Sequence, residues 1–462
     1  MPGRVSMRSV VKFLSAFLLV VHFVFSACTA ESQSNKGSSL TTAPPTMQMP
    51  NVVPLFIEDG EFTSTLILVN GSTVQTFADV AVRALDGKTV AKKRVQFQPH
   101  SQQQLNIRTL LDAAGASGTT TGSILVTQSP ALSGVVITAV LAMTRVSSSA
   151  PNYINEEIVM PSSSGSQFLR AVADKGNGPP LLAITSLADT VQHVQVQCLE
   201  KRGGASTKNI DLTAGETLLT SACREETVHG SDFQRYSEDP PAESHGPIGI
   251  ALKSDAMSGS FAAFALEPHG SHDNKYFSSV PFTDPKMIMS TTTVFAGVPV
   301  GPATQLPTGT YIPSVALANF SSRDRHVTIR YARTSGENPE AENLESVTVP
   351  AQSSKEITLD GLKGDPDLQN SFLIAADGAP GDVAAKLVAR SDSQLKEVEL
   401  MGKDLMDPQN GGNHPWSVEQ GTESTLLLQY QQCSAIFRRR DYQWQDNLAE
   451  SLSIEADADH GH

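Results

Sequence analysis

The sequence Thr-Leu-Ile-Leu-Val-Asn at residues 65–70, followed by Asp-Val-Ala-Val-Arg at residues 79–83, decides the fold of this chain. The first segment is rich in aliphatic residues and ends in a polar residue where the chain turns. The second segment alternates apolar and polar residues. Alternation with a period of two places one side chain in the core and the next in solvent. The two segments therefore predict neighbouring β-strands.

The same pair of segments recurs twice further along the chain. The later copies of the first segment are residues 182–186 (Leu-Ala-Ile-Thr-Ser) and 314–319 (Ser-Val-Ala-Leu-Ala-Asn), and those of the second are residues 193–197 and 326–330. A short turn follows each pair at a nearly constant distance. Its copies are residues 97–101 (Phe-Gln-Pro-His-Ser), 212–216 (Leu-Thr-Ala-Gly-Glu) and 349–353 (Val-Pro-Ala-Gln-Ser). Such agreement in order and spacing indicates an internal repeat.

Each copy ends in two further apolar segments joined through Gly, Ser or Pro. These segments occupy residues 122–141, 247–266 and 371–389. Two apolar runs separated by turn-forming residues are typical of a β-hairpin. We therefore expect the last two strands of each repeat to pair with each other.

About seven short strands per repeat, at spacings of ~8–12 residues, indicate an immunoglobulin-like sandwich. Helical periodicity is scarce, and residues 108–114 form at most one or two turns inserted in a loop. The predicted fold class is all-β, with tandem immunoglobulin-like antiparallel β-sandwiches, three complete and a truncated fourth. Over residues 52–401 the chain resembles the poorly characterised sandwich repeats of exported bacterial proteins and lipoproteins. That resemblance implies a surface or envelope module and carries no functional residue with it.

The repeats divide the chain into segments. The expected boundaries are a signal peptide at 1–27, a disordered tether at 28–50, β-sandwiches at 51–147, 151–268 and 274–402, and a linker with an incomplete fourth repeat and an irregular tail at 403–462. The fourth copy begins at residues 423–428 (Glu-Ser-Thr-Leu-Leu-Leu), and the composition changes at Gln429. The tail after Leu428 is explained by a frame-shifted or truncated reading frame, or by a genuine tail that donates a strand to a neighbour.

The first residues have the three parts of a secretory signal. Arg4, Arg8 and Lys12 precede an apolar run at residues 13–25, which is shorter than the roughly 20 residues of a membrane-spanning helix. Small residues and then Cys28 follow. This order resembles the lipobox of bacterial lipoproteins, with Phe25 in the place of the usual leucine, and implies lipidation of Cys28. The alternative is ordinary cleavage near Ala27 or Ala30, which gives a secreted or periplasmic protein.

Net charge bears on the class of partner, and the cysteines bear on a possible disulfide. The formal net charge is −14, which repels phosphate backbones and argues against nucleic acid as a partner. Cys198 and Cys223 lie in one repeat on two predicted strands. An exported protein can oxidise them to a disulfide, and the alternative is a pair of buried thiols.

No catalytic motif stands out, so no catalytic residue, cofactor or metal is predicted. The best metal candidate is residues 267–273 (Glu-Pro-His-Gly-Ser-His-Asp), where two histidines and carboxylates suit zinc. Because this segment follows a repeat's last strand, a polar linker explains it better. The sequons that begin at Asn70 and Asn319 are explained more simply as turns at strand ends.

These observations favour a non-enzymatic cell-envelope protein, acting as a spacer, adhesin or assembly scaffold through stacked sandwiches. Its partner would be an unidentified protein or glycan at the cell surface, and a lipid anchor would be its only link to the membrane. A glycan-binding module is the second interpretation, although aromatic residues make up only 6% of the chain. An enzyme with a site not visible in the sequence is the third.

Overall fold

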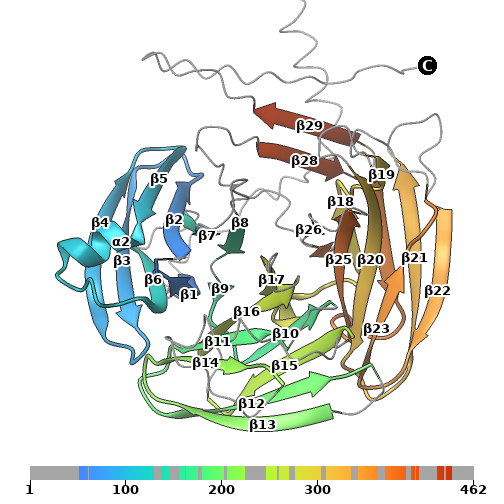
Figure 1. The fold of residues 1–462 in the computed structure, drawn as a ribbon, viewed down its shortest axis with the longest axis horizontal. Helices are drawn as coiled ribbons and strands as arrows, with labels where there is room; N and C mark the ends of the chain where they lie inside the picture. The colour runs from blue at the N-terminus through green and yellow to red at the C-terminus, as the bar shows by residue number, and fades with distance from the viewer. Residues whose placement is uncertain are drawn as a thin grey trace, which may run out of the picture. The chain divides into compact units, whose positions relative to one another are not determined.

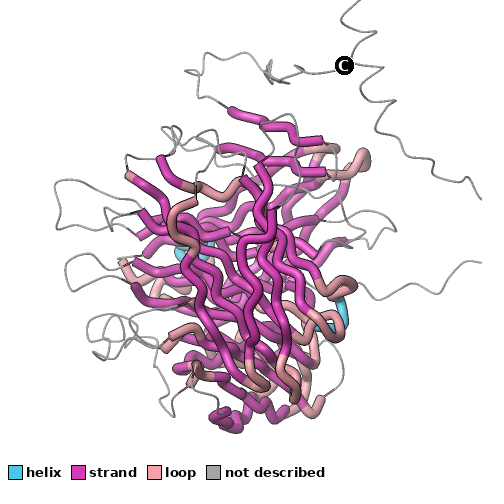
Figure 2. The backbone as a smooth tube through the Cα atoms, turned by 90° about the vertical axis from the view of Figure 1, so that its right-hand side faces the viewer, coloured by secondary structure: helices cyan, strands magenta, loops and turns pink. Residues whose placement is uncertain are grey.

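Antiparallel β-strands make up nearly all of the regular structure (Figure 2). The prediction of an all-β sandwich protein is confirmed. This computed structural model describes residues 51–60, 62–129, 137–145, 156–161, 163–174, 179–201, 205–223, 246–256, 260–269, 276–302, 309–333, 342–362, 370–391, 397–400, 402–404, 424–430 and 433–439. The signal segment and Cys28 lie outside these residues. Within them, no helix combines the length and the apolar character needed to cross a membrane.

The first sandwich contains two sheets, with strand orders β4-β3-β6-β1-β9 and β5-β2-β7-β8 (Figure 1). Its strands are β1 (Asn51–Ile57), β2 (Phe62–Asn70), β3 (Thr76–Ala84), β4 (Thr89–Phe97), β5 (Ser101–Asn106), β6 (Thr121–Ser129), β7 (Ile137–Arg145), β8 (Glu156–Pro161) and β9 (Ser163–Ser164). A short helix, α2 (Ile107–Ala113), follows β5, as the sequence indicated. The side chain of Asn106 caps it by accepting a hydrogen bond from Thr109 N at 2.8 Å.

The second sandwich repeats this arrangement, with orders β13-β12-β15-β10 and β14-β11-β16-β17. Its strands are β10 (Phe168–Ala173), β11 (Leu181–Ser186), β12 (Gln192–Leu199), β13 (Ala205–Leu212), β14 (Thr217–Ser221), β15 (Ile248–Ser254), β16 (Phe261–His269) and β17 (Tyr276–Pro281). A disulfide joins Cys198 at the end of β12 to Cys223 beyond β14, with the two Cα atoms 5.7 Å apart. It links the two sheets of the sandwich.

The third sandwich has the orders β22-β21-β24-β18-β27 and β19-β20-β25-β26, with β23 also paired to β20. A short 3-10 helix, η2 (Pro285–Met287), precedes it. Its strands are β18 (Thr292–Ala296), β19 (Gly301–Pro302), β20 (Thr310–Asn319), β21 (Arg325–Arg333), β22 (Glu342–Val349), β23 (Ser353–Thr358), β24 (Asn370–Ala376), β25 (Val383–Ser391), β26 (Glu397–Leu400) and β27 (Lys403–Asp404). Beyond it, β28 (Ser424–Tyr430) pairs with β29 (Cys433–Arg439) in a two-stranded sheet. β29 lies where the sequence suggested an irregular tail.

The strand order is a variation on the immunoglobulin sandwich. Counting strands from the start of each of the first two repeats, the second pairs with the fifth and the third with the sixth, as in immunoglobulin domains. The first strand, however, lies beside the sixth, and the seventh lies beside the second. The outer strands have therefore exchanged sheets.

This exchange overturns the expected closing hairpin. Strands β6 and β7 belong to opposite sheets, and the same holds for β15 with β16 and for β24 with β25. Both positions beside β6 are already taken, by β1 and β3. Sheets in a sandwich lie about 10 Å apart, a distance that connections of six or seven residues, as found here, span easily. Turn residues between two apolar strands do not distinguish a hairpin from such a crossing.

The ends of the sandwiches also differ from the sequence-based segments. Strands β8 and β9 fall in residues 151–268, but β8 pairs with β7 and β9 with β1 of the first sandwich. Likewise β17 pairs with β16 of the second sandwich, although residue 274 was expected to open the third. Each repeat thus gains a further edge strand after its seventh strand.

The turns of the first and third repeats share one hydrogen-bond pattern. Asn319 is fully buried, and its Nδ2 donates to the carbonyl oxygens of Arg323, Val349 and Pro350 at 2.8–3.0 Å, while its Oδ1 accepts from Ser321 N. Asn70 is buried in the same way and donates to Val74 O and Gln98 O. Both asparagines of the sequons are therefore structural residues at strand ends.

The turn before β5, β14 and β23 has a common backbone conformation in all three repeats. His100 and Gln352 adopt positive φ angles of 50° and 48°, and Gly215 occupies the corresponding position with a φ of 73°. Left-handed backbone is rare for side chains larger than glycine. The repeat therefore preserves this turn even where glycine is absent.

Candidate functional site

Strand β16 carries two charged or titratable residues into the interior of the molecule. Glu267 and His269 are two positions apart, so their side chains point to the same face of the sheet. Asp174 follows the end of β10 and joins them. All three are buried, with relative exposures of 1%, 5% and 3% for Glu267, His269 and Asp174. Because buried carboxylates are costly unless paired, this cluster is the candidate functional site.

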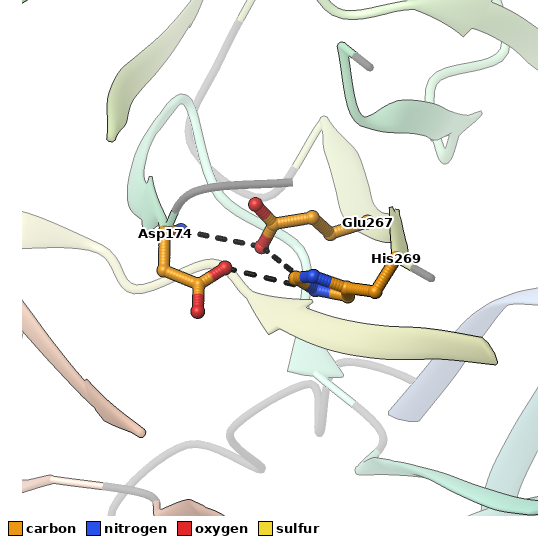
Figure 3. Close-up of side chains that lie close together, drawn as sticks. All are labelled: Asp174, Glu267 and His269. Carbon is orange, nitrogen blue, oxygen red and sulfur yellow. Dashed lines mark hydrogen bonds and ion pairs between the residues drawn. The ribbon is translucent and has the colours of Figure 1, made fainter. Parts of the chain in front are cut away.

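The three side chains lie within a few ångströms of one another (Figure 3). Nε2 of His269 is 3.6 Å from Oδ1 of Asp174 and 3.8 Å from Oε2 of Glu267. The backbone N–H of Asp174 donates to Oε2 of Glu267 at 3.2 Å, and the same imidazole nitrogen lies 2.8 Å from Oγ of Ser278 on β17. Two carboxylates and an imidazole thus converge from two segments of the second sandwich, the end of β10 and strand β16.

Strand β25 of the third sandwich supplies two cations to this cluster. Lys386 is buried, and its Nζ lies 3.2 Å from Oε2 of Glu267 and 3.3 Å from Oγ of Ser278. Arg390 donates from Nη2 to Oδ2 of Asp174, and its Nη1 lies 3.5 Å from Oε1 of Glu356 on β23. The cluster therefore spans two sandwiches.

The environment of the cluster determines the protonation state of Asp174. Burial acts to raise the pKa of this carboxyl. The positive charges of Lys386 and His269, the interaction with the Glu267 side chain and the charge of Arg390 together outweigh burial and hold the pKa of Asp174 well below its ordinary value. Asp174 is consequently a carboxylate at any pH near neutrality.

A small apolar contact also joins the second and third sandwiches. Val172 of β10 packs with Ala316 and Ala318 of β20. A Cβ placed on Gly249 of β15 would come within 2.7 Å of the Ala318 Cβ, so only glycine allows the two sheets to approach this closely.

A cation–π contact extends the same interface. The guanidinium of Arg170 on β10 lies 4.7 Å from the ring centroid of Phe168 and 4.9 Å from that of Phe320, at the end of β20. The same side chain donates through Nη1 to the carbonyl of Gly381, which belongs to the third sandwich.

The first and second sandwiches also share a core. Strands β11, β14, β16 and β17 turn one face toward the first sandwich, and the residues of that face within its core are Leu181, Ala183, Leu219, Phe264, Leu266 and Phe277. Phe277 meets Phe62 of β2 edge to face, with ring centroids 6.1 Å apart. Polar bonds cross the same contact: Thr185 Oγ1 donates to Pro54 O at 3.1 Å, and Thr217 N donates to Leu85 O at 2.8 Å.

Sequence reasoning reached only part of this site. Glu267 and His269 were noted as metal-ligand types but assigned to a polar linker, and the structure corrects that reading because both belong to buried β16, which pairs with β17. His272 and Asp273 of the same motif lie outside the described residues. Asp174, Lys386 and Arg390 were missed. A signal existed: Lys386 stands within the otherwise apolar run Val-Ala-Ala-Lys-Leu-Val-Ala at residues 383–389.

Comparison with protein-family models, with curated proteins and with solved structures finds no match for this chain. Its function must therefore be argued from its own residues.

Proposed function

We propose that this chain is a non-enzymatic cell-envelope protein that acts as a rigid assembly scaffold. The observation that carries the proposal is the buried charge cluster shared by the second and third sandwiches. The ion pairs fix where one sandwich sits on the other, because in this packing each buried charge needs its partner. Separation of the two sandwiches would also expose the apolar surface of Val172, Ala316 and Ala318 to water, which opposes it.

Rigidity distinguishes a scaffold from a flexible string of binding modules. Inter-domain contacts in a flexible chain are ordinarily polar and limited in area. Here the side of the second sandwich that faces the first contributes six apolar side chains to a shared core, and its opposite contact carries the ion pairs. The middle sandwich is thus fixed on both sides, which suits a role in holding other molecules at set positions.

The proposed cellular location of the protein is the cell envelope, where a lipid on Cys28 would anchor it to the membrane. Support comes from the positive segment, the apolar run and the small residues that precede this cysteine. Metabolic labelling with a fatty-acid analogue tests it. We expect incorporation into the wild-type chain and none into Cys28→Ser. Equal labelling of both would contradict lipidation at this residue.

A glycan array tests the scaffold role against carbohydrate binding. The expected result is no specific retention of the purified chain on any glycan. Specific and saturable retention would contradict a purely structural role, and a hydrolytic activity lost on substitution of a single acidic residue would contradict the non-enzymatic assignment.

A further inference from the structure

We propose that Asp174, Glu267 and His269 form a binding site for one divalent transition-metal ion of the zinc class. This inference goes beyond the scaffold role and does not depend on it. One imidazole and two carboxylates are a common donor set for Zn²⁺ and its neighbours in the first transition row. All three donors are buried, as in sites that retain their ion.

The distances suit a common ion. Ligand atoms bound at about 2.1 Å to one ion lie at most about 4.2 Å apart. His269 Nε2 meets this limit with both carboxylates, at 3.6 Å from Asp174 Oδ1 and 3.8 Å from Glu267 Oε2. The donor atoms all lie within 4.8 Å of one another, so closing the shell requires only a small movement of one carboxylate.

A second observation points independently to a ligand. Oδ1 of Asp174 is buried and makes no hydrogen bond within the described part of the structure. This oxygen lies 3.6 Å from Nε2 of His269, beyond hydrogen-bond distance. Buried charged acceptors without partners are rare because their desolvation is costly. A metal ion at this point would satisfy Oδ1.

The charges around the site influence the affinity. The carboxylates of Asp174 and Glu267 pair with Arg390 and Lys386, and Arg390 also lies near Glu356. Arg390 binds the outer oxygen Oδ2 of Asp174 and so orients Oδ1 toward the site, as partners outside a metal's ligand shell do. Lys386 repels an incoming ion and competes for Glu267. Removal of the lysine charge is therefore expected to tighten metal binding.

The test is a titration of the purified full-length chain with ZnCl₂, followed by calorimetry and by metal analysis after gel filtration. The background carries His460→Ala and His462→Ala, so that the terminal histidines bind no zinc. We expect one equivalent of zinc in this protein, at least a tenfold loss of affinity in His269→Ala and in Asp174→Asn, and tighter binding in Lys386→Met. His193→Ala is the matched control, because His193 forms an exposed pair with Asp211 at 2.6 Å, and we expect it to leave binding unchanged.

Absence of stoichiometric zinc, or unchanged binding in His269→Ala, would overturn the proposal. X-ray absorption at the zinc edge of the parent protein provides a readout that does not require the variants to fold. One nitrogen ligand with oxygen ligands supports the site, and a shell of oxygen alone or one containing several histidines contradicts it. Neither result bears on the rigidity of the sandwiches, so the two proposals fail separately.

Discussion

Nζ of Lys386 in strand β25 lies 3.2 Å from Oε2 of Glu267 in strand β16, and this buried ion pair joins two sandwiches of one chain. The side chains are 6% and 1% exposed, so neither charge is screened by solvent. The net contribution of a buried ion pair to the free energy of unfolding is small, because desolvation offsets the attraction. Removal of one partner is nevertheless strongly destabilising, because the other charge stays buried and unpaired.

Lys386→Met is expected to lower the free energy of unfolding by about 3–5 kcal/mol, because it leaves Glu267 buried without its ammonium partner. The double variant with Glu267→Gln is expected to recover a large part of that loss. Urea denaturation measures both. Lys88→Met is the control, since Lys88 pairs with Asp86 in solvent, and no measurable change is expected. Additive effects of the two cluster substitutions would contradict the coupling.

The lowered pKa of Asp174 predicts how the free energy of unfolding changes as the pH falls. Its folded pKa lies below the value of about 3.9 in the unfolded chain. Its contribution is therefore complete above pH ~4 and is lost as the pH falls toward the folded pKa. Urea midpoints of the wild type and Asp174→Asn, measured from neutral pH downward, are expected to converge in acid. A difference that grows as the pH falls would reverse the assigned sign.

The raised pKa of Glu58, in the first sandwich, predicts the opposite dependence of stability on pH. Burial raises its pKa, against the lowering effects of the Ser64 N–H and the Arg108 guanidinium. The folded state then prefers the protonated form, so the stability of the wild type relative to Glu58→Gln is expected to decline as the pH rises through the raised pKa. The same urea series measures this, and a constant difference would contradict it.

Asn319→Ala is expected to cost about 2–3 kcal/mol, because the amide satisfies three carbonyl groups at a buried turn and its loss leaves them without that donor. The exposed Asn209 of β13 provides a matched substitution that should change little. Thermal and urea unfolding of both variants checks this. Equal effects of the two would remove the structural role assigned to the asparagine.

The disulfide between Cys198 and Cys223 closes a loop with a sequence separation of 25. In the chain-entropy picture, such a loop closure stabilises the folded state by about 3–4 kcal/mol. We expect Cys198→Ala with Cys223→Ala, or a reducing agent, to lower the urea midpoint accordingly. Cys433→Ala is the comparison and should leave the midpoint unchanged.

The sequence was sufficient for the repeated inner strands and their turns, but not for the added edge strands, for β29 or for the pairing of the strands. Period-two alternation depends on local burial and located β3, β12 and β21 correctly. Strand pairing is non-local, so nothing between β6 and β7 revealed that they enter different sheets.

The buried cluster was hidden for a related reason. Asp174 and Lys386 are far apart in the chain and individually resemble surface charges. Only the packing of the second sandwich against the third removes both from solvent. Gly249 is similar, because its small size matters only where Ala318 approaches it.

The central claim is that the sandwiches form one rigid unit, and a distance distribution between the first and third tests it most directly. Spin labels on Lys92→Cys of β4 and Glu345→Cys of β22 occupy exposed positions, in a background with Cys28→Ser and Cys433→Ser. Pulsed electron paramagnetic resonance is expected to give a single narrow distribution in the wild-type interface and a broader one in Gly249→Leu, which forces β15 away from Ala318. A broad distribution that Gly249→Leu does not change would contradict the account.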